Sequence, residues 1–345
     1  MPWEIVKPGT RIDFIGKRHL AALVSALVLI ASVAAVFLNG VRLGIDFAGG
    51  TEVQLAFAPG VEASDGAIRD VLSSALEIEE ASVVRYGEEG DNEFLIKFKG
   101  TINEETGGVE GAEAVVEGQD LIVRLEKALE GAIGTVEIER VEFVGPKVGE
   151  ELRADGVKAL FYASLAILVY IAFRFNARFA PGAIVAVLHD LSITAGIFVI
   201  LGMEFDLRIL AAMLAILGYS LNDTIIIYDR VRENMALHTS VALPDVLNQS
   251  VNQTLSRTVL TSGTTLIAML SLYFLGGPVI QPFAFAMILG VFVGTYSSIY
   301  IAAPVLLFLE QRFGSVAVAE VETQERKTQP RSGGGSRAKR KKARS

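Results

Sequence analysis

The sequence predicts a polytopic α-helical membrane protein with six transmembrane helices and a small α+β, ferredoxin-like extracytoplasmic domain. Hydrophobic residues make up 51% of the 345 residues, and the mean hydropathy of +0.46 is higher than a soluble globular chain requires. Six segments are long and apolar enough to cross a bilayer. Between the first two of these segments lies an acidic stretch in which strand-like and helix-like patterns alternate.

The predicted spans follow from the thickness of the bilayer, because a hydrocarbon core of about 30 Å requires roughly 20 apolar residues in a helix. The apolar run of the first span is longer than the roughly 7–15 residues of a signal-peptide core, which favours a retained anchor over a cleaved signal. The last span is expected to be interrupted near Pro282 and Pro304. The six spans cover residues 20–38, 156–173, 179–203, 207–228, 258–275 and 279–309, so that helices two to six fall within 156–311.

The distribution of Lys and Arg predicts the orientation of the chain. Basic residues precede the first span, follow the last one, and recur in every second connection, as at Arg174 and Arg178. By the positive-inside rule these segments lie in the cytoplasm. We therefore expect a cytoplasmic N-terminus at residues 1–19 and a basic, disordered cytoplasmic tail at 312–345, and we place residues 39–155 outside the cytoplasm.

The predicted outer domain, residues 39–155, reads as a β-α-β-β-α-β unit. Alternating apolar residues indicate strands, and apolar residues three and four apart indicate helices. This order is that of a ferredoxin-like sandwich. The Gly- and Glu-rich segment 100–118 is expected to be a mobile insertion. The strands are predicted at 51–57, 82–86, 93–99 and 135–144, and the helices at 64–76 and 119–133.

The composition argues against enzymatic chemistry. The chain has no cysteine and only three histidines, which excludes disulfides, thiolate catalysis and cysteine-built metal sites and disfavours a histidine-built one. No Gly-x-x-x-x-Gly-Lys-Ser/Thr phosphate loop is present in the sequence. We therefore expect no catalytic residues, no cofactor, no bound metal and no specific nucleic acid partner.

Two carboxylates fall inside predicted spans: Asp190, next to His189, and Asp223, next to Asn222. A charged group at that depth is costly and normally faces a protein or water-filled interior. We interpret Asn222 and Asp223 as a polar stripe on a proton path that includes Asp190, with Arg257 as the neighbouring cation. The alternatives are helix packing for the stripe, topological anchoring for Arg257, and a buried hydrogen-bonded pair for His189 and Asp190.

Two glycine-containing segments flank the outer domain. The first permits a tight turn after the first span, in which Asp46 can accept hydrogen bonds from nearby backbone amides. The second leads into the second span and is interpreted as a hinge at the membrane surface. We call the first segment the signature and the second the hinge. Their candidate residues are Asp46, Gly49, Gly50, Gly145, Pro146 and Gly149.

Taken together, several strings resemble the SecF members of the SecD/SecF family of protein-export subunits, within the RND superfamily. The resemblance implies an accessory subunit of the Sec translocase in the bacterial cytoplasmic (inner) membrane. It implies that the subunit works with SecD, the SecYEG channel, the translocating polypeptide and membrane lipid. It also implies use of the proton-motive force in late steps of export, through an acid in the fourth span and an arginine at the start of the fifth, which match Asp223 and Arg257. The strings are residues 46–51, 145–149, 189–190, 219–234 and 252–265.

Two other functions remain as alternatives. An RND-type small-molecule efflux subunit would use the same kind of membrane helices, but such pumps have larger outer domains than residues 39–155 provide. A non-conducting scaffold subunit would need no ionisable group such as Asp223 inside a span. The sequence contains one six-span half and no internal repeat, so we expect it to pair with a second six-span chain.

Overall fold

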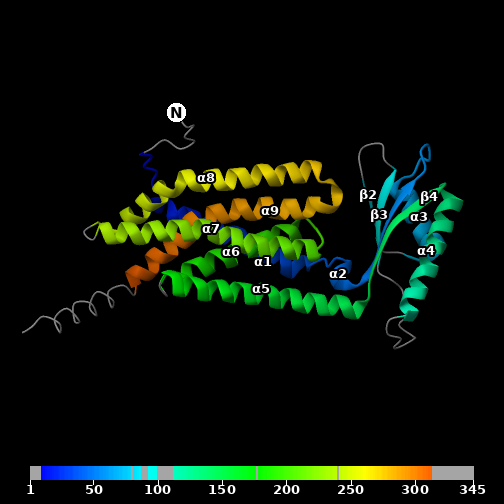
Figure 1. Cartoon of the computed structure of the whole chain (residues 1–345), viewed down its shortest axis with the longest axis horizontal. Coiled ribbons are helices and arrows are strands. Elements are labelled where there is room, and N and C mark those ends of the chain that lie inside the picture. Colours follow the sequence, from blue (N-terminus) through cyan, green and yellow to red (C-terminus); the bar gives the residue numbers. More distant parts are fainter. Residues whose placement is uncertain are drawn as a thin grey trace, which may run out of the picture.

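The computed structural model describes residues 9–78, 81–86, 92–98, 112–175, 178–238 and 241–312. Long helices form a bundle, and a small domain of strands and helices lies at one end of it (Figure 1). The basic tail beyond Arg312 and most of the predicted insertion lie outside the described residues. From Ala112 onward, the expected insertion is instead the first part of a helix, consistent with its Ala and Glu content.

Six helices of the bundle are long and apolar enough to cross a membrane, as the sequence predicts. They extend beyond the predicted spans because polar residues continue the helix past the apolar segment at several ends. A short 3-10 helix, η1 (Ile15–Lys17), leads into the first of them. The six are α1 (Arg18–Asn39), α5 (Pro146–Phe175), α6 (Ala180–Ile200), α7 (Leu207–Leu237), α8 (Leu243–Leu275) and α9 (Gly277–Ser297), the last of which continues to Arg312.

The prediction that the last span is interrupted near its prolines is wrong at Pro282, whereas close to Pro304 the α-helix is interrupted by a π turn. Helix α9 runs through Pro282, and the chain is helical again around Pro304. The irregularity is a π-helical turn between them, η2 (Ser298–Ala302). A π turn widens the backbone, and it directly precedes Pro304, which has no N–H to give to the preceding turn. The change of helix type therefore accommodates the second proline without ending the span.

Helices α6, α7 and α9 form the centre of the bundle. In their most apolar windows 56%, 50% and 50% of residues are buried, whereas α5 and α8 have 11% buried. The outer helices thus leave most of their apolar surface uncovered by protein, as expected of helices that face lipid. Polar side chains on α6, α7 and α9 are consequently the ones placed in a protein interior.

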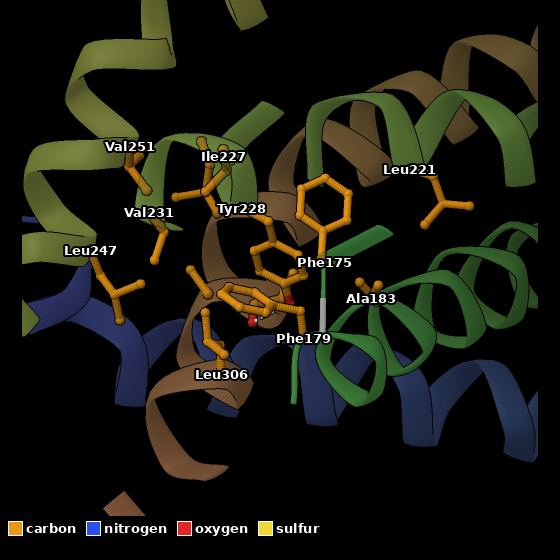
Figure 2. Close-up of a cluster of buried hydrophobic side chains, with 14 of the residues drawn as sticks. Phe175, Phe179, Ala183, Leu221, Ile227, Tyr228, Val231, Leu247, Val251 and Leu306 are labelled. Atoms are coloured by element: carbon orange, nitrogen blue, oxygen red, sulfur yellow. Dashed lines mark hydrogen bonds between the residues drawn. The ribbon is translucent and has the colours of Figure 1, made fainter. Parts of the chain in front are cut away.

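An aromatic cluster joins the ends of the helices farthest from the sheet (Figure 2). The rings of Phe179 and Tyr228 pack edge to face with centroids 5.2 Å apart. The Tyr228 hydroxyl donates a hydrogen bond to the carbonyl of Ala302 in η2 at 3.0 Å. Leu247 and Val251 of α8 complete the cluster. Residues 243–256, which precede Arg257, are therefore the packed beginning of α8.

The small domain is a four-stranded antiparallel sheet with the strand order β2-β3-β1-β4, the order of a ferredoxin-like sandwich. Helices α3 and α4 share one core with the sheet, in which Leu55, Leu72 and Leu125 are fully buried. The Ser64 hydroxyl caps α3 by accepting from the amide of Ala67. The elements are β1 (Gly50–Phe57), α3 (Asp65–Leu76), β2 (Ala81–Tyr86), β3 (Glu93–Phe98), α4 (Ala112–Ala132) and β4 (Val136–Val144).

Candidate functional site

Asp190 lies at the point where the three central helices meet. Its side chain on α6 is completely buried. One carboxylate oxygen accepts hydrogen bonds from the hydroxyls of Ser220 on α7, at 2.5 Å, and Ser297 on α9, at 2.7 Å. The other lies 2.9 Å from Nδ1 of His189. The carboxyl group thus has a hydrogen-bond partner at both oxygens, which offsets part of the cost of burying it.

Asp223 lies on α7 and is 1% exposed. Its Oδ2 accepts a hydrogen bond from the hydroxyl of Ser262 on α8 at 3.3 Å. The Ser262 hydroxyl is also 2.7 Å from that of Thr295 on α9. Oδ1 has no hydrogen-bond partner among the described residues. Asp223 is therefore incompletely satisfied, in contrast to Asp190, and has one oxygen free to receive a proton.

The two carboxylate clusters are neighbours in the bundle. On α7, Ser220 belongs to the Asp190 cluster and lies three residues before Asp223. On α9, Ser297 belongs to the Asp190 cluster, and Thr295 belongs to the Asp223 cluster. These hydroxyls are absent from the candidates that sequence reasoning selected. Two signals were available for them: a hydroxyl one turn before Asp223, and the polar run 295–298 in an otherwise apolar span.

Arg257 and Asn222 do not complete the site in the way the sequence suggested. Arg257 is exposed, and among the described residues it forms no ion pair with Asp223, although it is close enough to act on that carboxylate electrostatically. Asn222 is exposed while Asp223 is buried, so the two do not share an inward face within this chain. Successive helical residues are about 100° apart, which places these neighbours on different sides of α7.

Asp46 contacts a distant amide rather than a neighbouring one. It lies in α2 (Ile45–Ala48), and its Oδ2 accepts a hydrogen bond from the amide of Leu207 at 2.9 Å. Leu207 is the first residue of α7, and Asp206 caps this helix by accepting a hydrogen bond from the amide of Ile209 at 2.9 Å. Two carboxylates therefore satisfy the first amides of α7, the helix that carries Asp223, and complement its dipole.

The predicted signature and hinge glycines form one packed joint. Gly49 has φ +77°, and a Cβ at this position would lie 2.9 Å from Cα of Pro146. A Cβ at Gly149 would lie 3.0 Å from the amide nitrogen of Gly49. Gly50 also has a positive φ, of 150°, whereas Gly145 has open space around it. The close approach of α2 and α5 thus depends on Gly49 and Gly149; movement at this joint stays a prediction.

Replacing Gly149 with Leu is expected to separate α2 from the start of α5. The new side chain would meet backbone atoms of Phe47 and Gly49, which cannot move aside as a flexible side chain can. We expect the free energy of unfolding to fall by about 1–3 kcal/mol and proteolysis near residues 40–50 to increase. Gly145→Leu is the matched control, since nothing lies within 4 Å of its Cβ position. Equal resistance of the two variants to limited proteolysis would contradict the packed joint.

The described residues contain no group of three or more His, Asp or Glu placed to hold a metal ion. What the site offers instead is a set of buried carboxylates and hydroxyls contributed by α6, α7, α8 and α9. Such groups can bind protons and pass them between hydrogen-bonded neighbours. These groups have the chemistry that the predicted proton path requires; the path itself stays a prediction.

Comparison with known proteins gives two family matches. Residues 124–312 match the model of the C-terminal part of protein export membrane proteins SecD/SecF, and residues 34–61 match the SecD/SecF GG motif. The second match contains Asp46, Gly49 and Gly50. The first contains Asp190, Asp223 and Arg257. Most of the candidate residues thus lie in segments that the family shares.

Several curated relatives match along nearly their whole length. A protein translocase subunit SecF from Calditerrivibrio nitroreducens is 38% identical over 316 residues, covering 89% of this chain and 97% of that protein. One from Magnetococcus marinus is 41% identical over 324 residues, covering 93% and 99%.

A solved structure is also similar. The crystal structure of SecDF from Thermus thermophilus, described as a translocon-associated membrane protein, matches with a TM-score of 0.75 and 36% identity. The match covers 90% of this chain but only 40% of the solved one. The present chain therefore corresponds to less than half of that protein.

Proposed function

This chain belongs to the SecD/SecF family of protein-export membrane proteins, and we propose that it uses the proton-motive force, together with SecD, to promote late steps of polypeptide export. It is a multi-pass bacterial membrane protein and a SecF-type accessory subunit of the Sec translocase. The names of the relatives favour this role over small-molecule efflux.

The observation that carries the proposal is the incompletely satisfied carboxylate of Asp223. A buried acid with one free oxygen, next to the hydroxyls of Ser262 and Thr295, is suited to binding and releasing a proton. Arg257 is on the same helix as Ser262, five residues toward the end of the bundle away from the sheet. We propose that it attracts the deprotonated carboxylate and so assists release.

We propose SecD as the second six-helix half. The SecDF match supports this pairing, because the rest of that longer chain is unmatched by this one. A row of small and polar residues is also exposed along α7, the helix that carries Asp223. Small residues permit close helix contact, and an exposed amide inside a span calls for a polar partner. The row consists of Ala211, Ala215, Gly218 and Asn222.

The orientation of the chain belongs to the same proposal. Both termini lie in the cytoplasm, and the sheet domain faces the other side of the inner membrane, where it meets polypeptide emerging from SecYEG. The basic connections at the end of the bundle away from the sheet support this placement.

The proposal is tested with vesicles that contain SecYEG, SecD and this chain. We expect completion of export, measured as protease protection of the substrate polypeptide, to rise only when this chain is present and a proton gradient is imposed. Collapsing the gradient with a protonophore after translocation has begun should remove the gain. A gain that persists without the gradient would instead show a non-conducting scaffold.

A further inference from the structure

A groove with a volume of about 640 Å³ runs between α1, α6 and the final helical segment after η2. This volume lies within the range of about 300–1,000 Å³ that is usual for small-molecule sites. The walls are mainly apolar, and parts of them are open to the membrane: Leu188 is 54% exposed and Phe308 is 64% exposed. Ala22 and Ala26 of α1 are small, and they line the groove.

The groove reaches the histidine beside the buried carboxylate of Asp190. His189 lines the groove and is only 5% exposed. Its Nδ1 is engaged with Asp190, whereas Nε2 makes no hydrogen bond with the described residues. A buried ring nitrogen without a partner costs free energy. This nitrogen is itself buried, so a molecule in the groove meets the largely apolar wall around it rather than Nε2.

The groove has a cationic end. Arg18 and His19 line it at the start of α1, and Leu29 lines it further along the same helix. The twelve residues from Arg18 to Leu29 are separated by eleven helical steps and span about 16 Å, close to half of the roughly 30 Å hydrocarbon thickness. The groove is therefore as long as one leaflet, with its basic end at the membrane surface.

Asp13 interacts electrostatically with Arg18 but forms its hydrogen bonds with other groups. The carboxylate of Asp13 accepts hydrogen bonds from the side-chain amide of Asn248 and from the amide of Gly16, both at 2.7 Å. These bonds, together with the charges of Lys17 and Arg18, keep the pKa of Asp13 below its ordinary value. Arg18 itself donates to the carbonyl of Ile15 through one of its several N–H groups. Donors thus remain for an anion at the groove mouth.

We propose that this groove binds one anionic phospholipid of the adjacent leaflet. The headgroup phosphate pairs with Arg18, and one acyl chain lies along the alanine-lined wall as far as His189. The charge at the mouth, the one-leaflet length and the mainly apolar walls together specify a lipid with an anionic head and an acyl chain. Because His189 lines the groove and its Nδ1 contacts Asp190, the acyl chain ends beside the buried carboxylates.

The proposal is tested by native mass spectrometry of the full chain in mild detergent. Equal amounts of phosphatidylglycerol and phosphatidylcholine with the same acyl chains are added. We expect one phosphatidylglycerol to be retained in preference to phosphatidylcholine. Arg18→Gln should reduce this preference about fivefold, the effect of one basic residue near a membrane surface. Arg174→Gln is the control, because Arg174 is a basic residue on α5 that does not line the groove.

A second variant tests the walls. Ala26 is exposed in the groove, so Ala26→Trp should fill the space without disturbing the protein core. Retention of both lipids should fall while the melting temperature in lipid-free detergent stays unchanged. Equal retention of the two lipids by the unmodified chain, or unchanged retention by Ala26→Trp, would overturn the proposal. A loss of SecD binding in Ala26→Trp with no change in lipid retention would also overturn it, because the groove would then hold a partner helix.

Discussion

Replacing Asp223 with Asn is expected to reduce proton-driven stimulation of export to the level of vesicles that lack this chain. Asn has nearly the same shape as Asp, and it can keep a hydrogen bond with Ser262. It cannot, however, bind and release a proton in the way a carboxylate does. The measurement is gradient-dependent protection of an exported polypeptide, with the amount of inserted protein determined in parallel.

Asp229→Asn is the matched control for this experiment. Asp229 lies six residues further along α7, is exposed, and pairs with Arg232 at 3.0 Å. The same chemical change there removes a surface ion pair worth about 0–1 kcal/mol and should leave stimulation intact. If Asp223→Asn vesicles respond to the gradient as the unmodified protein does, Asp223 is only a packing residue.

Replacing Gly196 with Val should have the largest effect on stability. Gly196 of α6 lies against Ser32 of α1, and a Cβ at this glycine would overlap the Ser32 side chain and approach its Cα to 2.6 Å. Because a backbone atom blocks the way, α1 must move away from α6. We expect the free energy of unfolding to fall by about 3 kcal/mol, which is the upper end of the usual cost of overpacking. Thermal unfolding of the purified chain measures it.

Gly218→Val provides the comparison for this substitution. Gly218 is also a glycine within a membrane helix, but nothing lies within 4 Å of its Cβ position. The change in helix propensity is the same in both variants, so the difference between their melting temperatures isolates the contact with Ser32. Equal melting temperatures would show that α1 is not held tightly against α6.

The sequence was sufficient for features that depend on local pattern. Apolar runs predicted the six spans, and alternation predicted the four strands, because burial imposes a period on each element. Contacts between distant segments were beyond it. Nothing near Asp46 in the sequence points to the amide of Leu207, 161 residues away. The burial of Asp223 and exposure of Asn222 likewise depend on how α7 is rotated against α8 and α9.

The polar partners of the carboxylates were missed for a related reason. Serine is common in membrane helices, where its hydroxyl bonds to the backbone of its own helix or its small size allows close packing. Ser220, Ser262 and Ser297 therefore did not stand out in the sequence. Only the crossing of α6, α7 and α9 selects Ser220 and Ser297 as donors to Asp190. The π turn after Ser297 also changes the phase of the helix, so that a regular helical projection misplaces the residues that follow.

The double cap at the start of α7 gives this helix the mechanical character of a lever. From Asp223 to Leu207 the helix rises about 24 Å. A tilt of about 5° around Asp223 would therefore displace the capped end by about 2 Å. That displacement is large compared with the tolerance of the 2.9 Å hydrogen bond between Asp46 and Leu207. A small tilt of α7 near Asp223 would thus break or form the hydrogen bond between Asp46 and Leu207, at the base of the sheet domain.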